Sequence, residues 1–264
     1  MEFSGNFPTL FLSHGAPNLV LTPLPARQCL LDLGASLSRP HAIVVASAHY
    51  DEGPVARVTS APNPRTIHDF NGFDPSLHQM SYPAPGAPDL ADKLVRALSN
   101  VGLPAQLDDQ WGFDHGTWVP LMLMYPQADV PVIALSIDGR ADPRYHLELG
   151  RALTAFRGRR VLVIGSGAFT HNLGQVAPPA GNTAAPDWVD AFADWMGEKI
   201  QEGDETTLLE YREKAPFAQH NHPTAEHLLP MFVAMGAAGQ GWRAQRLHTS
   251  VSYRILRMDM FRFD

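Results

Sequence analysis

Short, continuous runs of apolar and β-branched residues recur along the chain, and a histidine follows three of them closely. Continuous runs of this kind are typical of strands in a parallel sheet that is covered on both faces. Ligands of open α/β sheets bind outside the carboxyl ends of such strands. We therefore expect the three histidines to meet in one crevice. The pairs of run and histidine are 8–13 with His14, 42–48 with His49, and 161–165 with His171.

Longer segments place apolar residues every three or four positions, a spacing that predicts amphipathic helices. In the segment 87–100, Leu90, Leu94 and Leu98 repeat at helical spacing. Pro88 lies near its start, where helices accept proline. Further helices are predicted at 24–37, 119–125, 143–157, 186–201, 206–213 and 225–236, and further strands at 54–59, 131–137 and 242–256.

The alternation of predicted strands and helices favours an α/β fold. We expect a three-layer sandwich whose mostly parallel or mixed central sheet is flanked by helices, in one domain over residues 1–264. The segment 51–88 is rich in Pro, Gly, Asn and aromatic residues. Long loops of this kind often carry function in compact domains, so we expect this one to cover the crevice. Thr224 is predicted to be the N-cap of the last helix.

Composition and charge narrow the classes of partner. The formal net charge is −7 and no run of Lys or Arg occurs, so we expect neither a nucleic-acid nor a membrane partner. The sequence shows no signal-peptide pattern and no apolar stretch near the roughly 18 residues of a transmembrane helix. Its single cysteine, Cys29, is expected to be a packed side chain in a reducing compartment, which predicts a cytoplasmic protein.

The chain contains twelve histidines, and most single histidines in proteins lie on the surface or are hydrogen-bonded in the core. We interpret His41, His78, His146 and His248 in that way. The three histidines that follow predicted strands differ, and the pair Glu226-His227 in the first turn of the last predicted helix adds a fourth candidate. Several imidazoles with an optional carboxylate suit Zn(II) or non-haem Fe(II), so the residue types leave the metal open.

His115 lies between Asp114 and Gly116 in a tryptophan-flanked turn. It is a candidate acid–base group or substrate hydrogen-bond donor, with Asp114 fixing its tautomer. We expect the loop histidines His68, His220 and His222 in solvent or behind the ligands. The aromatic residues that either line the pocket or belong to the core are Phe70, Tyr82, Trp111, Phe113 and Trp118.

Eight blocks in this order resemble one known family, the class III extradiol ring-cleavage dioxygenases, in the branch of the DOPA 4,5-dioxygenase type. The resemblance runs from residue 8 to about residue 235. The blocks are Leu12-Ser13-His14-Gly15-Ala16-Pro17, Ser47-Ala48-His49, Thr66-Ile67-His68-Asp69-Phe70, Tyr82-Pro83-Ala84-Pro85-Gly86, Trp111-Gly112-Phe113-Asp114-His115-Gly116, Leu135-Ser136-Ile137-Asp138, Gly165-Ser166-Gly167 with His171-Asn172-Leu173, and Pro223-Thr224-Ala225-Glu226-His227.

This resemblance implies a set of site residues. His14, His49 and His227 would be the metal ligands, and His171 would be either a fourth ligand or an acid–base residue. His115 would lie in the substrate pocket as a second catalytic residue. Members of this class use Fe(II) for turnover, and Zn(II) occupies the same site in some. Because other class III enzymes use a glutamate as third ligand, Glu226 is the alternative to His227.

The resulting hypothesis is an extradiol dioxygenase that inserts O2 into a DOPA-like or other substituted catechol, working as a monomer or homodimer. Two alternatives remain open at this point: a zinc-dependent hydrolase on a related scaffold, and a protein that binds metal or catechol without turnover.

Overall fold

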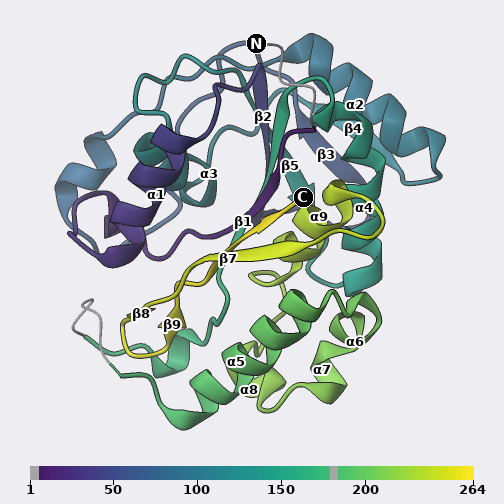
Figure 1. Ribbon diagram of the computed structural model, residues 1–264. Coiled ribbons are helices and arrows are strands. Elements are labelled where there is room, and N and C mark those ends of the chain that lie inside the picture. Colours follow the sequence, from purple (N-terminus) through teal and green to yellow (C-terminus); the bar gives the residue numbers. More distant parts are fainter. Residues whose placement is uncertain (1–5, 179–183) are drawn as a thin grey trace.

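The computed structural model (Figure 1) describes residues 6–178 and 184–264. Its eight-stranded sheet has the order β4-β3-β5-β2-β6-β1-β10-β7 among the described residues. The central strands β5, β2, β6 and β1 are parallel to one another. Beyond β1, β10 pairs antiparallel with β1, and β7 pairs antiparallel with β10. The strands are β1 (Thr9–Ser13), β2 (Ala42–Asp51), β3 (Ala56–Thr59), β4 (Ala105–Asp108), β5 (Val132–Ile137), β6 (Val161–Gly167), β7 (Ala244–His248) and β10 (Met260–Phe263), with β8 (Val251–Ser252) and β9 (Leu256–Arg257) forming a separate ladder.

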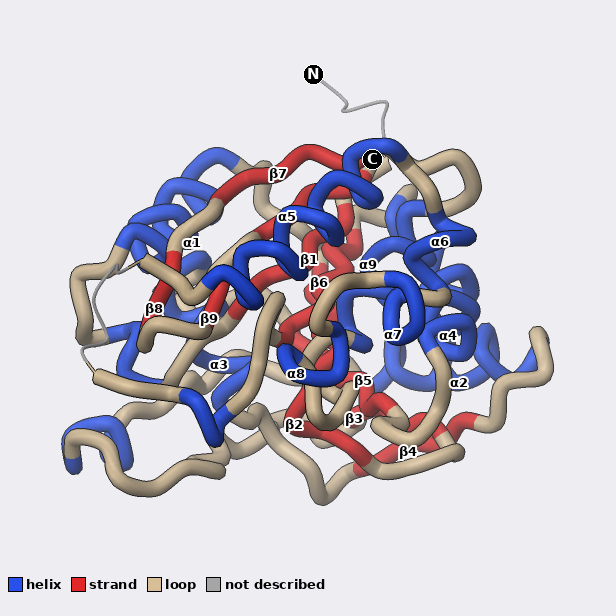
Figure 2. The backbone as a smooth tube through the Cα atoms, turned by 90° about the horizontal axis from the view of Figure 1, so that it is seen from below, coloured by secondary structure: helices blue, strands red, loops and turns tan. Residues whose placement is uncertain are grey.

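Helices cover both faces of the sheet, as Figures 1 and 2 show from two directions. α1 and α3 pack on one face, and α2, α4 and α9 pack on the other. The helices are α1 (Pro25–Ser36), α2 (Pro88–Asn100), α3 (His115–Met124), α4 (Pro143–Arg157), α5 (Asp187–Glu202), α6 (Glu205–Leu209), α7 (Tyr211–Lys214), α8 (Ala218–Asn221) and α9 (Leu229–Ala238). This arrangement confirms the predicted α/β sandwich.

Neighbouring residues of the central strands supply two different cores. In β2, Ile43 and Val45 belong to the core beneath α1 and α3, whereas Val44 and Ala46 belong to the core beneath α2, α4 and α9. Successive side chains of a strand point to opposite faces, so a strand covered on both sides must be apolar throughout. This requirement explains why β1, β2, β5 and β6 are continuous apolar runs in the sequence.

Several predicted element boundaries are wrong. α9 begins at Leu229, with Pro230 in its first turn, so Thr224 is not an N-cap and the predicted helix 225–236 starts too early. Proline fits the first turn of a helix, because its missing N–H has no partner there. α3 begins at His115, earlier than predicted, because the Asp114 side chain caps it by accepting a hydrogen bond from the Thr117 N–H.

Two predicted elements are each divided into several shorter ones in the structure. The predicted helix 206–213 is two short helices, α6 and α7, and the predicted strand 242–256 contains β7, β8 and the first residue of β9. The edge strand β4 and the C-terminal strand β10 were not predicted. Cys29 is half-buried against the core beneath α1, as expected of a packed side chain.

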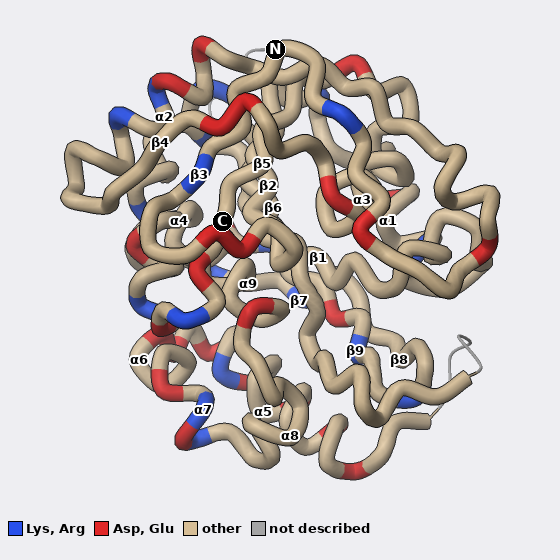
Figure 3. The backbone as a smooth tube through the Cα atoms, turned by 180° about the vertical axis from the view of Figure 1, so that it is seen from behind, with Lys and Arg blue, Asp and Glu red and all other residues tan. Residues whose placement is uncertain are grey.

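None of the helices in the described part of the chain is long and apolar enough to cross a membrane. Basic residues are interspersed with acidic ones along the backbone, as the view from behind shows (Figure 3).

The His146 ring is buried in α4 and is neutral. Its Nδ1–H donates to the Asp142 carbonyl at 2.9 Å, and its Nε2 accepts from the Asp138 N–H at 3.3 Å. Protonated Nε2 would face that N–H and lose its hydrogen bond. Burial lowers the pKa of His146 to about 4, so the folded ring takes up its proton at much lower pH than the unfolded one.

We predict that His146 makes folding pH-dependent between its unfolded pKa of 6.5 and its folded pKa of about 4. The unfolded chain binds more protons in this window, so stability is full above it and falls as the pH is lowered through it. From pH 7 to pH 5, His146 should account for about 2 kcal/mol of lost unfolding free energy. Urea denaturation of wild type and His146→Gln at both pH values measures this. An equal pH dependence in the two proteins would contradict the assignment.

Candidate metal centre

The parallel strands β1 and β2 flank β6 and deliver two histidines to the same edge of the sheet. His14 follows the last residue of β1 directly, and His49 lies two residues before the end of β2. The run 42–48 therefore does not end the strand, which continues past His49 to Asp51. The Nε2 atoms of His14 and His49 lie 3.2 Å apart.

His227 reaches this edge from the turn before α9. Its carbonyl oxygen accepts a hydrogen bond from the Ala168 N–H at 2.8 Å. A Cβ at Gly167, the last residue of β6, would lie 2.0 Å from the same oxygen, so the close approach requires glycine there. Ligand atoms of His14, His49 and His227 all lie within 4.8 Å of one another. The structure thus brings together the three residues that the resemblance implied as ligands.

The three rings are neutral. Burial, followed by the neighbouring histidines, holds the pKa of His14 and of His227 well below the usual value. Burial also lowers the pKa of His49 to about 3. A neutral imidazole has a free nitrogen lone pair, which is the form that binds a divalent metal ion. The donor set therefore fits Zn(II) or Fe(II) by ligand type.

Each ring also has a partner for its Nδ1 atom. His227 Nδ1 lies 2.9 Å from Glu226 Oε1, His49 Nδ1 lies 3.3 Å from Asp69 Oδ2, and His14 Nδ1 lies 3.1 Å from Ser166 Oγ. Ser166 Oγ donates its own hydrogen to the Gly116 carbonyl, so it accepts from His14. With every Nδ1–H engaged, the tautomer leaves each Nε2 atom free as a ligand.

His115 is held by Asp69, and not by Asp114 as the sequence suggested. Asp69 Oδ2 accepts from His115 Nδ1–H at 2.9 Å, and Oδ1 accepts from the His115 backbone N–H at 3.0 Å. Burial would raise the pKa of Asp69, but the His115 hydrogen bond and the nearby histidines lower it to about 2. Asp114 is fully buried and accepts hydrogen bonds from Ser47 Oγ and Trp111 Nε1 instead.

Asp69 is the site residue that sequence reasoning missed. It is distant in sequence from both histidines that it contacts, and spacing along the chain gives no sign of that contact. The available signal was its place in the Thr66–Phe70 block, inside a loop that was expected to cover the crevice. Part of that loop, residues 69–71 and Phe73, lines the cavity together with the histidines.

His171 lies beside His227 and outside the group of three. The two rings are stacked, with centroids 3.4 Å apart and planes inclined by 11°. Burial lowers the pKa of His171 to about 4. His171 also lines the cavity, so it faces whatever binds next to the histidines.

The cavity has a volume of about 280 Å³. His14, His49, His115, His171 and His227 lie in its lining, together with Asp69, Gly15, Ala16, Pro17, Phe70, Asn71, Phe73, Ala168, Leu173, Leu256 and Met258. Of the predicted pocket aromatics only Phe70 is among them: Tyr82, Phe113 and Trp118 belong to the core, and Trp111 stacks on Tyr50. His68, His220 and His222 do not line it.

Comparison with known proteins identifies close relatives of the chain. The family model of the catalytic LigB subunit of aromatic ring-opening dioxygenase matches residues 26–257. A 4,5-DOPA dioxygenase extradiol of Beta vulgaris is 38% identical over 97% of this chain and 96% of its own length. A 4,5-DOPA dioxygenase extradiol of Escherichia coli K12 is 40% identical over 89% of this chain and 86% of its own length. A crystal structure of an uncharacterized E. coli K12 protein has a TM-score of 0.79 at 31% identity, covering 97% of this chain and 99% of that one.

We predict that Asp69→Asn weakens the centre without unfolding the protein. The amide lacks the negative charge that faces His49 Nδ1 and that strengthens the hydrogen bond from His115 Nδ1–H. Loss of such an outer partner typically costs about 10- to 100-fold in metal affinity or activity. Zn(II) titration and catechol-dependent oxygen uptake measure the two effects. The matched control is Asp74→Asn, an exposed position in the same loop. Equal metal affinity and turnover in both variants would rule out this role for Asp69.

Proposed function

We propose that this chain, which belongs to the LigB family of aromatic ring-opening dioxygenases, binds its metal ion through His14, His49 and His227. The chain is an extradiol ring-cleaving dioxygenase of catechols, and hence an oxidoreductase. One observation carries the ligand assignment: three neutral imidazoles converge within 4.8 Å, and each has its Nδ1 engaged elsewhere. Each ring therefore has one nitrogen, Nε2, left to bind a metal ion.

Glu226 orients the third ligand in this proposal. Its carboxylate accepts the hydrogen bond from His227 Nδ1, an arrangement that fixes the tautomer of a metal-binding histidine. We therefore prefer His227 over Glu226 as ligand. Fe(II) is the proposed metal for turnover, although Zn(II) fits the same donors. When bound, Fe(II) supplies open positions at which a catechol and O2 meet in one geometry.

We assign His171 as a proton carrier and not as a fourth ligand. A metal ion lies near the plane of the imidazole that binds it, at about 2.1 Å from the nitrogen. The ring of His171 is nearly parallel to that of His227 and 3.4 Å away, so its lone pairs lie in a different plane. Burial keeps the ring neutral, so an unprotonated nitrogen is present beside the cavity, which is the state that a general base requires.

His115 acts as the second catalytic residue. Its Nδ1–H is held by Asp69, which leaves Nε2 as the acceptor in the cavity. Asp69 stabilises the ring when it becomes positively charged, so His115 is suited to accept a proton during ring opening. His115 lies beside His49 and His171 beside His227, so the two histidines then provide separate routes for the two hydroxyl protons.

The substrates are a catechol and O2, and we propose a DOPA-like or other substituted catechol. We further propose a cytoplasmic, single-domain protein that works as a monomer or homodimer without nucleic-acid or membrane partners. A single cysteine and a formal net charge of −7 support this view.

We predict that His14→Ala and His49→Ala each abolish metal retention, since two imidazoles do not replace three in holding the ion. Metal content after anaerobic loading with Fe(II) and gel filtration measures this. His41→Ala, at an exposed position away from the cavity, is the control and should retain the metal. Full metal content in both ligand variants would show that the ion binds elsewhere.

We predict a different outcome for His171→Ala. The variant should retain Fe(II) but lose turnover by about 10²-fold or more, the usual contribution of a positioned acid or base. Oxygen uptake and the absorbance of the yellow semialdehyde product, with and without air, report turnover. Loss of the metal itself would instead identify His171 as a ligand. Activity that is independent of oxygen would contradict the dioxygenase reaction altogether.

A further inference from the structure

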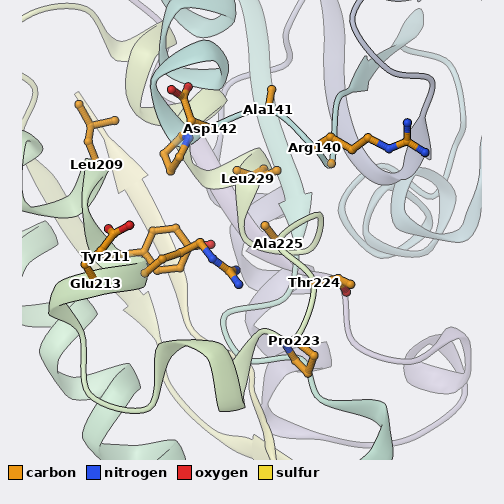
Figure 4. Close-up of a pocket in the computed structure, with 13 residues that line it drawn as sticks. Arg140, Ala141, Asp142, Leu209, Tyr211, Glu213, Pro223, Thr224, Ala225 and Leu229 are labelled. Carbon is orange, nitrogen blue, oxygen red and sulfur yellow. The ribbon is translucent and has the colours of Figure 1, made fainter.

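We propose that the chain has a second ligand site, apart from the histidine cluster, that binds a small α-amino acid with an apolar side chain. The site is a cavity of about 450 Å³, lined by α7 and by the segments 139–143 and 223–225 (Figure 4). Tyr211 and Arg212 hold the carboxylate of the amino acid, and Glu213 holds its ammonium group. Among the described residues, none lines both this cavity and the cavity of the histidine cluster.

The Tyr211 hydroxyl is buried and has no hydrogen-bond partner in the described part of the chain. Tyr211 is the first residue of α7, and its ring reaches toward the middle of the cavity in Figure 4. Nearly all buried hydroxyls in proteins have a partner, so an exception calls for an explanation. A ligand in the cavity that accepts a hydrogen bond supplies the missing partner.

The guanidinium of Arg212 lies near the same hydroxyl. Burial raises the pKa of Tyr211, and the neighbouring Arg212 opposes part of this rise. The guanidinium donates one hydrogen bond to the His222 carbonyl oxygen at 3.3 Å, and Arg212 is absent from the ion pairs of the described residues. A guanidinium has five N–H donors and binds a carboxylate through two of them in parallel. Arg212 and the Tyr211 hydroxyl therefore offer donors to the same carboxylate.

Acidic side chains balance the arginines in this lining. The charged residues that line the cavity are Arg140, Asp142, Arg212 and Glu213. The Asp142 side chain already accepts a hydrogen bond from the backbone at the start of α4, whereas Glu213 is exposed and follows Arg212 directly in α7. Neighbouring charges of opposite sign suit a zwitterion, and the acidic groups would repel a dianion such as phosphate.

The rest of the lining is mostly apolar. It includes Leu209, Leu229, Pro143, Pro223 and Ala225. Sites for small molecules are commonly cavities of about 300–1,000 Å³ that combine apolar walls with a few polar groups. The apolar walls match the side chain of an amino acid, and the charged groups of α7 match its backbone. A hydrophilic amino acid would leave these walls without a partner.

Arg140 has a different position from Arg212 and provides an internal control. It is exposed, and its side chain extends away from Tyr211 and Glu213 in Figure 4. The two arginines therefore have the same charge and border the same cavity, but only Arg212 lies beside the unpaired hydroxyl.

Calorimetric titration of the Zn(II)-loaded protein with L-phenylalanine tests the site. Saturating 4-methylcatechol is added under argon, so that phenylalanine is kept out of the catalytic cavity. The matched ligands are 3-phenylpropionate, which lacks the ammonium group, and phenethylamine, which lacks the carboxylate. We expect each to bind at least tenfold more weakly than phenylalanine. Absence of phenylalanine binding at millimolar concentrations, or equal affinity for all three ligands, would overturn the proposal.

Arginine variants locate the binding site. Arg212→Gln should weaken phenylalanine binding at least tenfold, whereas Arg140→Gln should leave it unchanged. Arg212→Lys keeps the charge but not the two parallel donors, and should bind more weakly than wild type. Circular dichroism of each variant reports whether it is folded. Undiminished binding in folded Arg212→Gln and Arg212→Lys would place the ligand elsewhere and contradict the proposal.

Tyr211→Phe separates a ligand-binding hydroxyl from a structural one. Because the hydroxyl has no partner in the free protein, its removal should leave the thermal unfolding midpoint equal or higher. Phenylalanine affinity should nevertheless fall at least threefold. A lower unfolding midpoint with unchanged affinity would identify the hydroxyl as structural and exclude it from the site.

Discussion

The parallel pairing of β1 and β2 on either side of β6 is the constraint on which the centre depends. It brings His14 and His49 to one edge of the sheet with their Nε2 atoms 3.2 Å apart. β6 contributes small residues at the same edge. Gly165 and Gly167 admit the carbonyl oxygens of Pro230 and His227 at distances that leave no room for a Cβ atom, and Ser166 holds the ring of His14. The small residues at the carboxyl end of β6 therefore help to position His14 and His227.

Clustering the imidazoles in the interior removes them from water, which costs free energy, and the surrounding polar groups reduce this cost. Burial removes the rings from water, and each added proton would repel its neighbours, which is why their pKa values are lowered. Glu226, Asp69 and Ser166 engage the Nδ1 atoms and so satisfy half of each ring's hydrogen-bonding capacity. The other half is what a metal ion would satisfy. Pre-organised ligands of this kind bind without first rearranging.

How far the sequence predicts this molecule depends on whether the determining interaction is local. The central strands were predictable because burial on both faces makes their sequences apolar throughout, and His14 and His49 were found from their places directly after such apolar runs. The pair Glu226-His227 was a candidate from the sequence pattern, but the resemblance was needed to prefer His227, and the predicted helix 225–236 misplaced both residues. Asp69 and the apolar wall of Phe73, Leu256 and Met258 arise from contacts between distant segments. No periodicity in the sequence records such contacts, so only the structure shows them.

The distance along the chain between His14 and His227 also determines when during synthesis the centre can form. β1 and β2 leave the ribosome early, yet the strand that lies between them, β6, follows more than a hundred residues later, and His227 later still. The nascent chain therefore displays two apolar strands whose inner partner does not yet exist. Long-range parallel pairing of this kind forms slowly and leaves strands exposed to misassembly in the meantime. The three histidines therefore come together only when the chain is nearly finished.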